Sequence, residues 1–180
     1  MLPEGDPALS ETQTSLGFVL SESAWLKRKA ADNASASAKA VEAERLLRDV
    51  WTNRRNTLEL NDWRLSLSQS ILGDAVAAAA VTEQTFDAGK QIAKLCEAES
   101  LLLEAHQRLV DMPSVAPSLR AKRIRRDMQR ISRLYESWDA AEPGKGYAEK
   151  AAEWRAKLEE EATKPRGDEA TKGPGDELFA

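Results

Sequence analysis

Hydrophobic residues recur along this chain with the period of an α-helix. The clearest case is residues 118–138, where apolar side chains fall every three or four positions. This spacing places them on one side of a helix and leaves the other side to basic residues. The apolar set is Ile124, Met128, Ile131, Leu134, Tyr135 and Trp138, and the basic set is Lys122, Arg123, Arg125, Arg126, Arg130 and Arg133.

The same period predicts helices elsewhere in the chain. Apolar positions share one face in residues 91–112 and in residues 147–161, and the stretch from Leu65 through the alanine-rich run 75–80 has high helix propensity. Asn61 and Asp62 precede this stretch and offer a capping side chain. Breaks between helices are expected at 32–37, at 85–90 with Gly89 in a left-handed conformation, at Pro113 and Pro117, and at 141–146.

The chain contains an internal repeat. Residues 2–17 match residues 58–73 at an offset of 56, and residues 42–47 match residues 97–102 at an offset of 55. Two blocks in the same order with nearly equal offsets indicate two copies of one structural unit. The identities in the first block are Leu2/Leu58, Asp6/Asp62, Leu9/Leu65, Ser10/Ser66, Gln13/Gln69, Leu16/Leu72 and Gly17/Gly73.

Composition favours an all-α protein and gives little support for an enzyme. Ala and Leu far outnumber Val and Ile, which suits helices rather than sheets. The net charge of −4 gives no general reason to expect nucleic acid or an anionic membrane as a partner. The longest apolar run has seven residues, which predicts no membrane span, and the first residues lack the basic and apolar regions of a secretory signal. These features predict a cytoplasmic protein.

Candidate chemistry is sparse. A single cysteine, Cys96, excludes an internal disulfide, and we expect it to be a small core residue. The single histidine, His106, is expected at a helix surface or an interface, and no metal or cofactor is predicted. The basic face between Arg120 and Arg133 could contact phosphates, but a solvated helix face, paired with acidic residues such as Glu149, Glu153 and Glu159 of the next helix, is the favoured interpretation.

Several motifs together resemble the tetratricopeptide repeat, in its longer kinesin-light-chain-like form. They are Leu-Gly late in the first helix of each pair and Glu-Ala-Glu-x-Leu-Leu in the second. Residues 61–73 and 97–104 are similar to repeats found C-terminal to bacterial serine/threonine protein kinases, and residues 133–138 with 149–158 look like the terminal repeat of such arrays. Kinase motifs themselves are not present, so the resemblance implies either a separate repeat protein or a detached regulatory piece of a repeat-bearing kinase.

The resemblance also implies roles for individual residues. Gly17 and Gly73 would lie where the first helix of each hairpin meets the second, opposite Ala43 and Ala98. These glycine–alanine spacings are longer than is usual in the family, which implies elongated hairpins. The complete repeat signature is Leu16, Gly17, Ala43, Leu72, Gly73, Ala98, Tyr135, Ala151 and Trp154.

We therefore predict a right-handed stack of three elongated antiparallel helical hairpins over residues 1–160. The three repeats are expected at about 2–57, 58–113 and 114–160, followed by a disordered tail at 161–180. The predicted function is a non-enzymatic module that binds a peptide or protein segment, with homo-oligomerisation as the alternative and nucleic-acid binding as a third, less favoured one. The resemblance gives Gln13, Asn33, Arg64, Gln69 and Arg126 as candidate binding residues.

Overall fold

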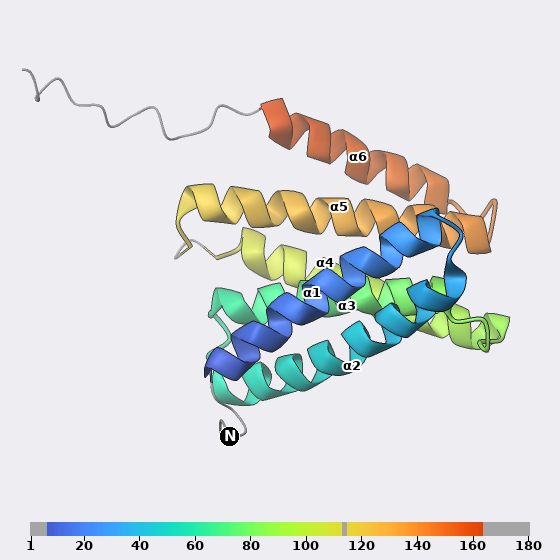
Figure 1. The fold of residues 1–180 in the computed structure, drawn as a ribbon. Helices are drawn as coiled ribbons and strands as arrows, with labels where there is room; N and C mark the ends of the chain where they lie inside the picture. The colour runs from blue at the N-terminus through green and yellow to red at the C-terminus, as the bar shows by residue number, and fades with distance from the viewer. Residues whose placement is uncertain (1–6, 113–114, 164–180) are drawn as a thin grey trace, which may run out of the picture.

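A computed structural model describes residues 7–112 and 115–163 of the chain, and these residues form six α-helices and no strand (Figure 1). The prediction of an all-α protein is confirmed. The helices are α1 (Pro7–Lys29), α2 (Asn33–Thr57), α3 (Trp63–Thr82), α4 (Ala88–Val110), α5 (Pro117–Ala141) and α6 (Tyr147–Thr163).

Each helix packs on the next one in sequence, and α1 and α5 also pack on α3. Short loops turn the chain back after each helix, so consecutive helices lie antiparallel (Figure 1). Because α3 has neighbours on most sides, every side chain from Ile71 to Ala80 is buried. The core of the protein is centred on this alanine-rich helix.

The apolar character of α3 also meets the length and composition criteria for a membrane span, with a mean hydropathy of 1.3. However, 89% of the apolar window is buried among the other helices. The core helix of a soluble fold meets the same criteria, so this is weak evidence for a membrane segment. None of the other helices in the described ranges is long and apolar enough to span a membrane.

Aspartate side chains fix the beginning of three helices. The carboxylates of Asp32, Asp62 and Asp87 accept hydrogen bonds from the backbone N–H groups of Ser35, Arg64 and Lys90. An N-cap carboxylate satisfies a backbone donor that has no partner within the helix. The cap expected at residues 61–62 is therefore present.

The positions of these N-caps show that two of the predicted turns were misplaced. Since Asp32 caps α2, residues 33–37 are helical and the first turn lies at 30–32, where Ala31 has the left-handed φ of 61°. Likewise α4 begins at Ala88, so Gly89 belongs to its first turn and is not the left-handed residue that we expected.

The last two helices are longer than the sequence pattern predicted. α5 covers Pro117–Ala141, and α6 continues to Thr163, so residues 161–163 belong to a helix and not to the predicted tail. The loop between them uses two left-handed glycines, Gly144 and Gly146. The disorder predicted for residues 164–180 concerns a segment outside the described residues.

The two repeat glycines occupy matching positions. A Cβ atom added to Gly17 would lie 2.6 Å from Leu47 Cγ, and one added to Gly73 would lie 2.8 Å from Leu102 Cγ. Only a residue without a side chain allows such a close approach of two helices. The nearest partners are thus leucines, one helical turn beyond the expected Ala43 and Ala98, which are themselves buried.

Candidate functional site

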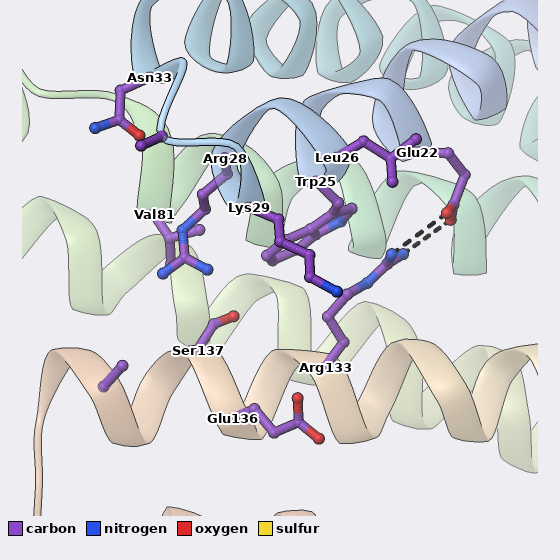
Figure 2. A pocket seen from close by; sticks show the side chains of 12 residues that line it. Glu22, Trp25, Leu26, Arg28, Lys29, Asn33, Val81, Arg133, Glu136 and Ser137 are labelled. Carbon is purple, nitrogen blue, oxygen red and sulfur yellow. Dashed lines mark hydrogen bonds and ion pairs between the residues drawn. The ribbon is translucent and has the colours of Figure 1, made fainter.

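A hollow lies between the C-terminal halves of α1 and α5. Both helices pack on α3, and the space between them forms an open cavity of about 840 Å³ (Figure 2). Figure 2 shows side chains of α1 and α5 pointing toward one another across this space. The lining residues are Glu22, Trp25, Leu26, Arg28, Lys29, Ala31, Asn33, Val81, Arg133, Glu136, Ser137 and Ala140. We call this cavity the α1/α5 groove.

Apolar side chains line part of the groove. Trp25 is buried, with the guanidinium of Arg133 from α5 over its ring, and Val81 comes from the end of α3. Leu26 is 68% exposed, although leucine is among the residue types most often buried. The groove therefore offers apolar surface that no described side chain covers.

A buried polar network holds one side of the groove together. Arg133 donates hydrogen bonds to Glu22 Oε1 over 2.9 Å and to Asp74 Oδ1 over 2.7 Å, and Ser21 Oγ donates to Asp74 Oδ2 over 2.7 Å. Asp74 is almost completely buried. Burial opposes the charge of Arg133, but Asp74 and Glu22 more than offset this effect and raise its pKa. The network ties α1, α3 and α5 into one unit.

Two basic side chains of the groove stay without a carboxylate partner. Arg28 and Lys29, at the end of α1, form no ion pair with any of the described residues. Partial burial lowers the pKa of Arg28, as expected for a cation that lacks a counter-charge. The remaining acid of the groove, Glu136, pairs instead with Arg155 of α6 over 3.1 Å. The groove thus carries an excess of positive charge beside apolar surface.

A second polar network corrects our interpretation of the basic face. Arg130 donates to Asp127 Oδ1 over 3.2 Å and to Ser70 Oγ over 3.0 Å, and all three side chains are buried between α3 and α5. Burial raises the pKa of Asp127, while Arg130 and Ser70 act against this rise. Arg130 and Arg133 therefore face neighbouring helices, and the prediction of a solvated face is wrong for both.

The expectation that acidic residues of α6 pair with the basic face is wrong for Glu149, Glu153 and Glu159. In the parts of the chain that the structure describes, these three form no ion pair with the basic residues of α5. Arg123 instead lies over the ring of Trp63, 3.9 Å from its centroid. The basic surface left to solvent is smaller than the sequence suggested.

The five candidate binding residues do not form one site. Asn33 lines the α1/α5 groove, whereas Arg64 forms an ion pair with Asp62 at the start of α3. Gln69 is buried and bonds to Glu104 and Arg108 of α4, so it cannot reach a ligand. Arg126 is exposed beside a small hollow near Trp63, and Gln13 is half-buried on α1.

The residues of the repeat signature differ in their burial. Ala43, Leu72, Ala98 and Ala151 are completely buried, whereas Leu16 is 48% exposed. The buried Tyr135 donates a hydrogen bond to Glu99 Oε1, and both burial and this bond raise the pKa of the phenol. Trp154 of α6 is half-buried and packs against α4 through a ring contact with His106.

The lone cysteine lies on the solvent side of α4, whereas the lone histidine lies at an interface between helices. Cys96 is exposed, so the expectation of a core position is wrong: α4 directs Leu95, Ala98 and Leu102 inward and leaves Cys96 on the solvent side. His106 lies at an interface, with its ring edge-on to Trp154 at 5.1 Å. Burial, and secondarily Lys157, lower its pKa. Within the described ranges, no three His, Cys, Asp or Glu residues could hold a metal ion together.

Sequence reasoning missed the role of Asp74. One signal was available, because Asp74 is the only charged residue between Ile71 and Val81 in an otherwise apolar stretch. A carboxylate in such a stretch needs a buried partner. The partner, Arg133, lies on α5 and could not be identified from spacing along the chain.

Comparison of the chain with protein-family models, with curated proteins and with solved structures gives no match.

Proposed function

We propose that this chain is a non-enzymatic protein–protein interaction module that holds a peptide or protein segment in the α1/α5 groove. The observation that carries the proposal is the combination of Arg28 and Lys29 without counter-charges and the exposed apolar side chain of Leu26 beside the half-buried Val81. Such a surface fits a segment in which acidic residues stand beside a bulky apolar side chain.

The architecture we propose is a right-handed stack of three elongated tetratricopeptide-like hairpins. The packing of each helix on its successor, and of α1 and α5 on α3, supports this arrangement. The equivalent close approaches at Gly17 and Gly73 support it as well. Stacked hairpins commonly bind partners along the surface lined by their first helices, which here are α1, α3 and α5. The resemblance to repeats of bacterial kinases supports a cytoplasmic, regulatory role for the module.

The test is a selection of binding peptides followed by affinity measurements. Peptides selected from a random display library on the intact chain should be enriched in Asp and Glu next to an apolar residue. Fluorescence anisotropy should then give at least a tenfold weaker Kd for the variant Arg28→Glu/Lys29→Glu, because opposite charges at the groove become like charges.

A matched control separates the groove from general attraction to positive charge. Lys122→Glu/Arg126→Glu changes the net charge by the same amount at two exposed positions outside the groove. Its Kd should stay within about twofold of the parent value at ~0.15 M salt, where the Debye length is ~8 Å. The proposal is refuted if this control loses affinity and the groove variant does not. The peptide would then bind to the surface around Arg126.

A further inference from the structure

One short segment of the chain itself has the chemistry that the α1/α5 groove favours. Residues 176–179 read Asp-Glu-Leu-Phe, and we call them the acidic–apolar segment. Its leucine and phenylalanine are the only large apolar residues in the sequence 164–180. The preceding residues, 164–175, are Gly, Pro, Ala, Thr and charged residues, a composition typical of a linker. The sequence after α6 therefore places two negative charges and two bulky apolar side chains beyond a linker.

The charges and the apolar surface of the groove are complementary to this segment. Arg28 and Lys29 form no ion pair with any described carboxylate. The acids of the lining, Glu22 and Glu136, already have arginine partners and leave these two cations available. Leu26 lies on the same helix, lines the same groove and is 68% exposed. Two acidic residues followed by two apolar ones would neutralise the cations and cover the apolar surface beside them.

The linker is long enough to bring the segment to the groove. Ser132 Oγ of α5 donates to the Ala151 carbonyl of α6 over 3.5 Å, so these residues lie at the same level. α6 ends at Thr163, twelve residues or about 18 Å beyond this level. α5, about 10 Å thick, stands between α6 and α1 (Figure 1). The fifteen residues from Thr163 to Leu178 span up to about 50 Å when extended, which exceeds the two distances together.

We propose that the acidic–apolar segment docks in the α1/α5 groove of its own chain and competes there with an external peptide. The competition rests on the proposed function, because it concerns the same groove. A tether of this length gives its ligand an effective concentration of about 1 mM, so a weak contact is enough to occupy the groove. The disorder predicted for this part of the chain agrees with such a role, since disordered segments order on binding. The groove is thus autoinhibited and selects partners that bind more strongly than the tethered segment.

A disulfide experiment tests the docking directly. In a Cys96→Ser background, Ala180→Cys adds a thiol beside the segment and Ala140→Cys adds one at the groove. The matched control replaces Ala140→Cys by Ala156→Cys, at an exposed alanine of α6 outside the groove and nearer to the start of the linker. Under mild oxidation, the groove pair should form a disulfide within one chain at least about fivefold faster than the control pair.

A charge exchange tests the predicted pairing. Arg28→Glu/Lys29→Glu should slow formation of the groove disulfide, because acidic residues then face each other. Adding Asp176→Lys/Glu177→Lys to the same chain should restore the rate, since the pairing is re-formed with its signs reversed. The inference is overturned if the groove and control disulfides form at equal rates, if the disulfide joins two chains, or if the charge exchange restores nothing.

Binding of the library-selected peptide separates this inference from the proposed function. Leu178→Ser/Phe179→Ser removes the apolar part of the segment, so the Kd of the peptide should decrease at least about threefold relative to the parent. An equal Kd in both chains, with affinity still lost in Arg28→Glu/Lys29→Glu, would overturn the autoinhibition and leave the proposed function standing. A peptide whose affinity ignores Arg28 and Lys29 would refute the proposed function instead, and the disulfide rates alone would then decide whether the segment docks.

Discussion

The first and second hairpins contain the same sequence repeat but bury it differently. Leu16 and Leu72 occupy equivalent positions, yet Leu16 is 48% exposed and Leu72 is completely buried. Contacts within a hairpin are nevertheless alike, since Gly17 faces Leu47 and Gly73 faces Leu102. The repeat thus determines how the two helices of one pair pack, and the other helices around each pair determine how much of its outer face is covered.

The largest expected effect on stability is the difference between an alanine substitution at Leu72 and one at Leu16. Leu72→Ala should lower the free energy of unfolding by about 3–4 kcal/mol, because it removes buried methyl groups and leaves a cavity in the centre of the core. Leu16→Ala should lower it by less than about 1 kcal/mol, since half of that side chain is already in water. Urea denaturation followed by circular dichroism measures both values.

Equal losses of stability in the two variants would contradict this comparison. They would mean that α1 is covered as completely as α3 in the free protein. The measurement should be made at low micromolar concentration, so that association of two chains does not stabilise the parent.

Much of the fold could be predicted from the sequence because it depends on local rules. Apolar periodicity located the helices, and Asp62 and the glycines of 141–146 marked their limits. The turn after α1 was misplaced because Asp32 acts as the N-cap of α2, and an aspartate within a polar run can equally belong to a turn.

The candidate site was far less predictable. The groove is formed by residues from α1, α3 and α5, which are distant in the sequence. The direction of the basic residues of α5 was also misjudged, because periodicity shows that Arg130 and Arg133 share a face but not which helix packs against it. Of the five candidate binding residues, only Asn33 lies at the groove.

A second comparison concerns the two repeat glycines. Gly73→Leu should destabilise the protein by about 2–3 kcal/mol, because the new side chain would overlap Leu102 in a helix that is enclosed on most sides. Gly17→Leu should cost less, because among the described helices α1 packs only on α2 and α3, and it can move away from α2 to relieve the overlap with Leu47. Thermal unfolding of both variants in parallel gives the difference, and a Gly73→Leu variant that melts like the parent would show that the equivalence of the two hairpins is wrong.

The smallest expected effect concerns the second helices of the two hairpins. Trp51 of α2 and His106 of α4 correspond at the offset of 55 residues, but only His106 receives a ring from the following hairpin, that of Trp154. His106 as a whole is 9% exposed. Burial, together with the nearby charge of Lys157, lowers the pKa of His106 below its ordinary value of 6.5.

The sign of the resulting pH dependence follows from this shift. The unfolded chain binds a proton on His106 at a higher pH than the folded chain does. The contribution of His106 to stability is therefore fully present above about pH 6.5, and it decreases as the pH falls toward the lower pKa of the folded state. Urea denaturation at about pH 7.5 and pH 5.5 should therefore show a smaller free energy of unfolding at the lower pH. His106→Phe keeps an aromatic ring against Trp154 but cannot titrate, so this variant should lose less stability between the two pH values than the parent does. If the parent and His106→Phe respond equally to pH, the imidazole is not buried against Trp154 in solution, and the second and third hairpins are less tightly packed than the ring contact indicates.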